Sequence, residues 1–275
     1  ETGISPIIVL EIESGGGLMI EMYAIHESLT KLKKNHRIVA WVKQAISAAA
    51  ATAFHCDEIY FMTEGNLGAM TGYAGTTALK GEALQQWLAD ASKWAESGGR
   101  PGMIARAMIH HPVLLSYDKD PETGKVTWYE SLQGEYKLSD EISNLSFSSS
   151  QALHSGFADG VADTKEQLAK YLDLAEWNEM SRTGYEAYEE WNKTVSRAKV
   201  EIPRIFGRFQ IIQGSAAASP EEKIGRMIDL LEQLIMWSRR APNVARYEAG
   251  LPPIEELERM IRDLKKQLSD MRRGR

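Results

Sequence analysis

The chain has 275 residues, of which 43% are hydrophobic and 25% charged, and its formal net charge is −6. This composition is ordinary for a globular protein, and the length allows one large domain with an appendage. The negative charge argues against a nucleic-acid-binding protein, which usually carries a basic surface. Cys56 is the one cysteine, so no intrachain disulfide can form, and we interpret it as a small buried residue. Neither a signal peptide nor an apolar run of membrane-spanning length is recognisable.

The first third of the chain predicts alternating strands and helices. Residues 7–12 form an apolar run typical of a buried parallel strand. Apolar residues at helical spacing follow to about Lys34, and further strands are predicted at residues 38–42 and 58–62. Because strands and helices alternate, we expect the strands to pair in parallel.

A glycine-rich loop, Glu13-Ser14-Gly15-Gly16-Gly17, follows the first predicted strand. A strand, a glycine loop and a helix in this order can form a cradle of backbone N–H groups that holds an anion. The loop does not match a dinucleotide-binding fingerprint or a P-loop, so no nucleotide is indicated. The alternative is a flexible turn without a ligand.

Ser47 lies between the second predicted strand and a run of alanines, residues 48–51. A serine at such a junction presents its hydroxyl at a helix N-terminus, where free N–H groups can stabilise a developing negative charge. This is one way to build a nucleophile. The alternative is that Ser47 simply caps a buried helix.

The rest of the first 175 residues is predicted to mix helices with short strands. Helices are expected over residues 77–97 and 103–109, and a hairpin over residues 113–136 with its turn at residues 120–124. A short capped helix at 148–153, a turn and strand at 156–162, and a helix from Thr164 to about Leu174 complete the region.

Four motifs in this order resemble the Clp/crotonase-fold serine peptidases, and most closely their signal-peptide-peptidase (SppA-like) and NfeD-type branch. The motifs lie at residues 12–17, 45–49, 56–69 and 151–161. Gly15 stands where that family usually has proline, and the strands that open the family's domain are missing before Ile7. The resemblance implies an α/β fold of stacked ββα-type repeats, without its N-terminal part, over residues 1–175. An all-α, partly coiled-coil region is expected over residues 176–275.

The resemblance also implies a serine endopeptidase that cleaves peptides or membrane-derived segments by acyl transfer. Ser47 is the expected nucleophile, and a lysine is the expected base in this branch. Lys80 opens the helix that runs to Ser97, where burial and the helix dipole would disfavour its ammonium form. Lys93, near the end of the same helix, is interpreted as a solvated charge.

Three histidines offer other candidate bases. His110 and His111 resemble a Clp active-site phrase, but that phrase should come right after the strand that follows the nucleophile helix, where residues 68–72 contain no histidine. We therefore interpret them as helix-end histidines. His26 lies on the apolar side of the first predicted helix and is expected to be a packed core residue.

The expected oxyanion hole consists of the backbone N–H groups of Gly16 and Ala48. Gly17 lies beside it, and residues Gly68, Ala69 and Met70 are expected to bind an extended peptide as an added strand. Neither a metal nor a cofactor is expected.

The C-terminal region predicts helices that pair with other helices. Trp177, Tyr185, Tyr188 and Trp191 form an aromatic stripe, which is more typical of a packing or oligomer surface than of a ligand site. Ser219 and Pro220 open a capped helix, and apolar residues from Ile254 to Met271 follow the 3,4 spacing of a coiled-coil seam. We therefore expect a homo-oligomer. The basic tail allows membrane association, and the resemblance favours an extracytoplasmic or membrane-associated location.

Two other functions stay open at this point. One is a crotonase-type enzyme that stabilises an acyl-CoA enolate with the same two N–H donors. That chemistry usually needs a carboxylate near the pocket, and Glu64 is the nearby candidate. The other is a catalytically inactive Clp-like scaffold that recruits partners through its helical tail.

Overall fold

The computed structural model describes residues 6–139, 142–214 and 219–273. The chain divides between Asn178 and Glu179 into two compact units, and each is described here by itself. The first unit contains the sheets and the second is helical. The expected fold class, an α/β region followed by an all-helical one, is confirmed.

A mainly parallel sheet forms the centre of the first unit. Its strands lie in the order β1 (Ile8–Ser14), β2 (Ile38–Ile46), β3 (Glu58–Gly68) and β10 (Gly160–Val161), all parallel to their neighbours. The strand β9 (Ser146–Ser148) pairs antiparallel with the end of β3. The three longest strands, β1 to β3, therefore end at the same edge.

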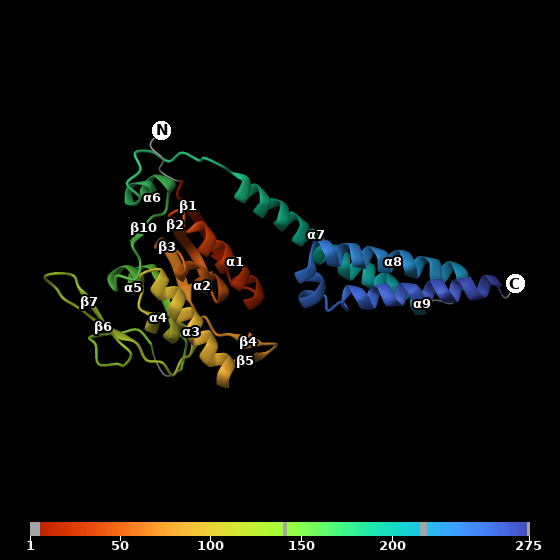
Figure 1. Ribbon diagram of the computed structural model, residues 1–275, viewed down its shortest axis with the longest axis horizontal. Coiled ribbons are helices and arrows are strands. Elements are labelled where there is room, and N and C mark those ends of the chain that lie inside the picture. The colour runs from red at the N-terminus through yellow and green to blue at the C-terminus, as the bar shows by residue number, and fades with distance from the viewer. Residues whose placement is uncertain (1–5, 140–141, 215–218, 274–275) are drawn as a thin grey trace. The chain divides into compact units, whose positions relative to one another are not determined.

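The two faces of this sheet are buried against different partners, because successive side chains of a strand point to opposite faces. Ile38, Ala40 and Val42 contribute to the main core, while Val39 and Trp41 pack in a smaller cluster with α6. Figure 1 shows α1 and α2 along one side of the sheet and α6 on the other. The helices of this unit are α1 (Met19–Leu32), α2 (Ala48–Phe54), α3 (Gly81–Ser97), α4 (Gly102–Ile109), α5 (Ser149–His154) and α6 (Lys165–Tyr171).

Two small antiparallel elements lie outside this sheet. One is the hairpin of β4 (Tyr73–Ala74) and β5 (Thr77–Ala78). The other is a three-stranded sheet in the order β7 (Val126–Tyr129), β6 (Ser116–Lys119) and β8 (Tyr136–Lys137). The predicted hairpin is therefore present, with a third strand added to it.

The third strand is longer than the sequence predicts. Its glycines suggested a loop after Met62, but β3 continues to Gly68. Gly65 lies so close to β2 that a Cβ atom there would be 2.6 Å from the Val42 carbonyl oxygen. In this strand glycine therefore permits close backbone contact at an irregular pairing and does not end the element.

The second unit is a bundle of α7 (Thr183–Gly214), α8 (Pro220–Arg240) and α9 (Ile254–Arg273), with a short π-helix, η1 (Val244–Glu248), before α9. As expected, the Ser219 hydroxyl accepts a hydrogen bond from the Glu222 N–H at the start of α8. Leu257 and Ile261 of α9 are buried in one core cluster with residues of α7 and α8. The apolar stripe of α9, which was expected to form a coiled-coil seam, thus packs against α7 and α8 of the same unit.

Candidate active site

Three loops of the first unit meet at one edge of the sheet. Gly16 follows β1, Ser47 follows β2, and Gly68 ends β3. These strands are parallel neighbours, so their C-terminal ends bring the three loops together. The Ser47 N–H donates to the Gly68 carbonyl oxygen at 3.0 Å, which joins the second loop to the third.

Ser47 has an unusual backbone conformation, with φ 59° and ψ −124°. A non-glycine residue held at positive φ costs about 1–3 kcal/mol, so the surrounding structure must enforce it. The Ser47 hydroxyl makes no capping hydrogen bond to α2. The side chain is half-buried. Ser47 is therefore a strained residue between strand and helix, and its hydroxyl is not used as a helix cap.

Gly16 lies directly against Ser47. A Cβ atom at Gly16 would be 2.7 Å from the Ser47 Cβ atom and 2.8 Å from the Ile46 carbonyl oxygen, and φ at Gly16 is +103°. Both the space and the torsion therefore require glycine at this position. The Gly16 N–H donates to the Ser14 Oγ atom at 3.1 Å, so this expected oxyanion donor is engaged within its own loop.

Two further N–H groups lie at the same place in the fold. Ala48 is the first residue of α2, and the N–H groups of a first helical turn have no acceptor within their helix. Gly17 is exposed at the end of the glycine loop. The structure thus brings Gly16 next to Ser47, and chain continuity places Ala48 beside them.

Lys80 stands directly before α3 in extended backbone, and its side chain is exposed. Within residues 6–139, 142–214 and 219–273, neither the Ser47 hydroxyl nor the Lys80 ammonium has a side-chain hydrogen-bond or ion-pair partner. The described contacts therefore do not join the expected dyad.

The segment expected to bind an added peptide strand is already paired. Gly68 pairs with Ile46 of β2 on one side and with Ser146 of β9 on the other. The Ala69 N–H donates to the Leu145 carbonyl oxygen at 2.9 Å. Met70 is buried, and its N–H donates to the Met108 carbonyl oxygen at 2.6 Å. A peptide strand would have to displace β9 in order to pair at Gly68.

A buried polar cluster lies elsewhere in this unit, where α1 packs on the turn after α2. His26 is buried against the Trp94 ring at 3.9 Å between centroids, and its imidazole is 4.8 Å from that of His55. Burial lowers the pKa of His26 to about 3. His26 is therefore a packed core residue, as the sequence indicates.

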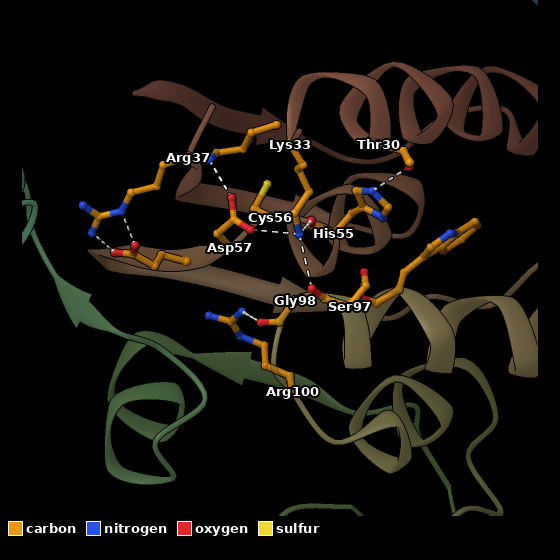
Figure 2. A network of polar contacts seen from close by, with 12 residues as sticks. Thr30, Lys33, Arg37, His55, Cys56, Asp57, Ser97, Gly98 and Arg100 are labelled. Carbon is orange, nitrogen blue, oxygen red and sulfur yellow. Dashed lines mark hydrogen bonds and ion pairs between the residues drawn. The ribbon is translucent and has the colours of Figure 1, made fainter. Parts of the chain in front are cut away.

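Lys33 holds the neighbouring turn together, as Figure 2 shows. Its ammonium contacts Asp57 Oδ1 at 3.0 Å and donates to the carbonyl oxygens of His55 at 2.9 Å and Ser97 at 3.3 Å. These contacts fix α1 to the ends of α2 and α3. They give Lys33 a structural role.

The other two histidines lie at the end of α4. His110 follows the last helical residue, Ile109, and its ring centroid is 5.9 Å from that of His111. Their helix-end position agrees with the sequence analysis.

Ser14 is a residue of the candidate site that the sequence motifs did not indicate. Its hydroxyl accepts from the Gly16 N–H and so controls whether that donor is available. A serine two residues before a glycine in a turn can bond the backbone in this way, and that spacing is the signal that was present.

Among the described residues, no group of three or more His, Cys, Asp or Glu side chains is arranged to hold a metal ion. None of the described helices combines the length and apolar character needed to cross a membrane.

Comparisons with known proteins add a family. Residues 1–180 match the family model described as "NfeD1b, N-terminal domain". Among solved structures, the chain is similar to a serine-to-alanine mutant of the 1510-N membrane-bound stomatin-specific protease, with 18% identity, a TM-score of 0.44, and coverage of 60% of this chain and 68% of that one. A lysine-to-alanine mutant of that protease, in complex with a substrate peptide, is also similar, with 18% identity and a TM-score of 0.44. That match covers 60% of this chain and 64% of the other. No curated protein matches the chain in sequence.

Proposed function

Because the chain belongs to the family of the NfeD1b N-terminal domain, we propose that it is a serine peptidase which cleaves peptides or membrane-derived segments by acyl transfer. The family match confirms the NfeD-type branch that the four motifs indicate. One observation carries the proposal of activity: Ser47 has a positive φ between β2 and α2, with Gly16 packed against its side chain. A sharp strand-to-helix turn of this kind exposes a nucleophilic hydroxyl.

In the proposed reaction, the Ser47 Oγ atom attacks the carbonyl carbon of the scissile peptide bond. The carbonyl oxygen becomes an oxyanion, which the N–H groups of Ala48 and the glycine loop would stabilise. The C–N bond then breaks, the amine leaves with a proton, and water hydrolyses the acyl-enzyme. The Gly16 N–H must first release the Ser14 hydroxyl, or the Gly17 N–H must serve in its place.

Lys80 is the proposed base because it opens the helix that follows the site loops. A serine hydroxyl is a weak nucleophile without a base, and a lysine can act as one when its neutral form is favoured. The exposed Lys80 side chain must approach Ser47 and lose water contacts when substrate binds. The resulting amine would accept the hydroxyl proton and later donate it to the leaving amine.

Labelling with a fluorophosphonate probe tests the nucleophile. We expect the probe to label Ser47 in the wild type, and Ser47→Ala to abolish labelling while the circular dichroism spectrum is retained. Ser97→Ala is the matched control, since Ser97 is an exposed serine at the end of α3. Equal labelling of the wild type and Ser47→Ala would refute the proposal.

The same assay separates the two lysines of α3. Lys80→Ala should slow labelling by about 10²–10⁴-fold, the usual contribution of a general base. Lys93→Ala should leave the rate unchanged. If both variants react at the wild-type rate, Lys80 is not the base.

An inactive scaffold is the second candidate, and one observation favours it: the described contacts leave Lys80 exposed and unpaired. A folded wild-type chain that self-associates but is labelled neither at Ser47 nor elsewhere would favour this candidate. The predicted extracytoplasmic or membrane-associated location stays a prediction.

A further inference from the structure

The first turns of α7 lack the packing that the rest of that helix has. We call residues 183–193 the α7 arm; every one of them is exposed. Buried residues of α7 begin at Ala198, and Figure 1 shows the arm extending past the end of α8. Three aromatic side chains lie on the arm, with Tyr185 53% exposed, Tyr188 59% and Trp191 44%. Large aromatic side chains on an otherwise unpacked helix point to a missing partner.

A shallow groove follows one face of the arm and continues into the next turn of α7. Tyr185, Tyr188, Glu189, Lys193 and Arg197 are among its lining residues. Within the residues that the structure describes, the charged groups of Glu189, Lys193 and Arg197 have no ion-pair or hydrogen-bond partner. The groove therefore presents both signs of charge beside aromatic rings.

Helical periodicity divides this face into two flanks. At 100° per residue, Glu189 and Lys193 lie on one side of a line through Tyr185 and Asn192, whereas Tyr188 and Val195 lie on the other. The acidic residue of the charged flank comes before the basic one along the chain. When a second copy lies antiparallel to this face, the basic residue of each copy meets the acidic residue of the other. The face is therefore complementary to itself.

We propose that the α7 arm pairs with the α7 arm of a second copy of this chain in an antiparallel, two-fold symmetric arrangement centred near Trp191. In an antiparallel helix pair, equivalent flanks of the two helices face each other. Glu189 then lies opposite Lys193 of the partner subunit, and the two-fold axis repeats that ion pair. Tyr185 lies near Arg197 of the partner subunit, within reach of a cation–π contact.

The charge pattern favours a second copy over an anionic lipid surface. Tyr and Trp side chains are also common at membrane interfaces. The arm, however, carries Glu186, Glu189 and Glu190, which anionic headgroups would repel. The inference concerns the second unit and does not depend on whether Ser47 is a nucleophile.

Sedimentation of the full chain tests the pairing. We expect the wild type to sediment at twice the chain mass and to dissociate as salt concentration rises. Lys193→Glu or Glu189→Lys alone should raise the dissociation constant about tenfold or more, because like charges then face each other. An equimolar mixture of the two variants should associate again, since one subunit then carries lysine and the other glutamate at both positions, which restores both ion pairs.

The control is Arg208→Glu, which reverses an exposed charge on α7 outside the arm and should leave the mass unchanged. A monomeric wild type, an unchanged mass after reversal at residue 189 or 193, or no recovery in the mixture would overturn the proposal. So would wild-type monomers that float with anionic vesicles and lose that binding in Trp191→Ala.

Cysteine crosslinking tests the direction. Cys56 is buried, so introduced cysteines can be followed without removing it. An antiparallel pair centred at residue 191 brings residue 185 nearly opposite residue 196 of the partner subunit, both on the groove face, and separates two copies of residue 185 by about 18 Å along the axis. Tyr185→Cys should therefore form a disulfide with Ser196→Cys and not with itself. Self-linking of each variant without the mixed product would overturn the antiparallel arrangement.

Discussion

The two units of this chain differ in what they bury. The first unit buries Arg100, His26 and His55 and holds Ser47 at a positive φ, all of which cost free energy. The second unit buries the apolar stripes of its helices, and its ion pairs, such as Arg239 with Glu258, lie on the surface. Buried polar groups and strained torsions usually occur where a protein requires something other than stability. The contrast supports a site in the first unit and a framework in the second.

The ion pair between the buried Arg100 and the exposed Asp159 is the most sensitive point of this comparison. Arg100 is 7% exposed, and its Nη2 atom is 2.5 Å from Asp159 Oδ2. Its other donors reach the carbonyl oxygens of Gly98 and Phe157. Asp159→Asn would leave the buried guanidinium without its counter-ion. Because Asp159 itself is partly exposed and screened by water, we expect the free energy of unfolding to fall by about 2–3 kcal/mol.

Urea unfolding followed by hydrogen exchange of peptides from each unit measures that loss separately. Glu130→Gln is the matched control, because Glu130 faces Arg106 near the surface and its loss should cost about 1 kcal/mol or less. Equal losses in the two variants would show that the burial of Arg100 adds nothing to the cost of losing its counter-ion.

The buried histidines predict a pH dependence confined to the first unit. Burial lowers the pKa of His26 from 6.5 to about 3 in the folded state. Between these values the unfolded chain binds the proton and the folded chain does not, so stability falls as the pH drops below 6.5. The expected loss is about 2–3 kcal/mol at pH 4.5.

His26→Leu should remove this part of the pH dependence, since it replaces the imidazole with an apolar side chain. Comparing the unfolding free energies of the wild type and the variant at pH 7 and pH 4.5 isolates the contribution of His26 from that of the carboxylates. Parallel changes in both proteins would rule out His26 as the source.

The smallest expected effect lies in the second unit, at the start of α8. The Ser219 hydroxyl accepts from the Glu222 N–H, and Ser219→Ala removes that cap. We expect a loss of about 1 kcal/mol, seen only in peptides from the second unit. Ser219→Asn, which keeps an acceptor, should retain most of the stability. A loss spread over both units would mean that they unfold together.

Much of the fold follows from local sequence patterns. Apolar runs predicted β1 and β2, and capping residues predicted the starts of α6 and α8, where the Thr164 and Ser219 hydroxyls accept N–H groups as expected. The extent of β3 was not predicted, because the reason for Gly65 is a contact with a neighbouring strand. Patterns within one segment cannot show contacts between segments.

The sequence predicted where the candidate site lies better than it predicted the contacts within the site. The motifs placed Gly16 and Ser47 near each other, and the structure brings them into contact. The engagement of the Gly16 N–H by Ser14 and the pairing of Gly68 on both sides depend on tertiary structure. The assignment of Lys80 as the base stays a prediction, because its position before α3 does not show how far its side chain extends toward Ser47.

The positive φ of Ser47 also limits which amino acids evolution or engineering can place there. A β-branched residue is strongly disfavoured at such a torsion. Threonine, whose hydroxyl serves other hydrolases as a nucleophile, is therefore a poor substitute despite its similar chemistry. Cysteine has an unbranched Cβ and a nucleophilic thiol. The backbone at this junction thus leaves a change from oxygen to sulfur as the accessible exchange of the proposed nucleophile.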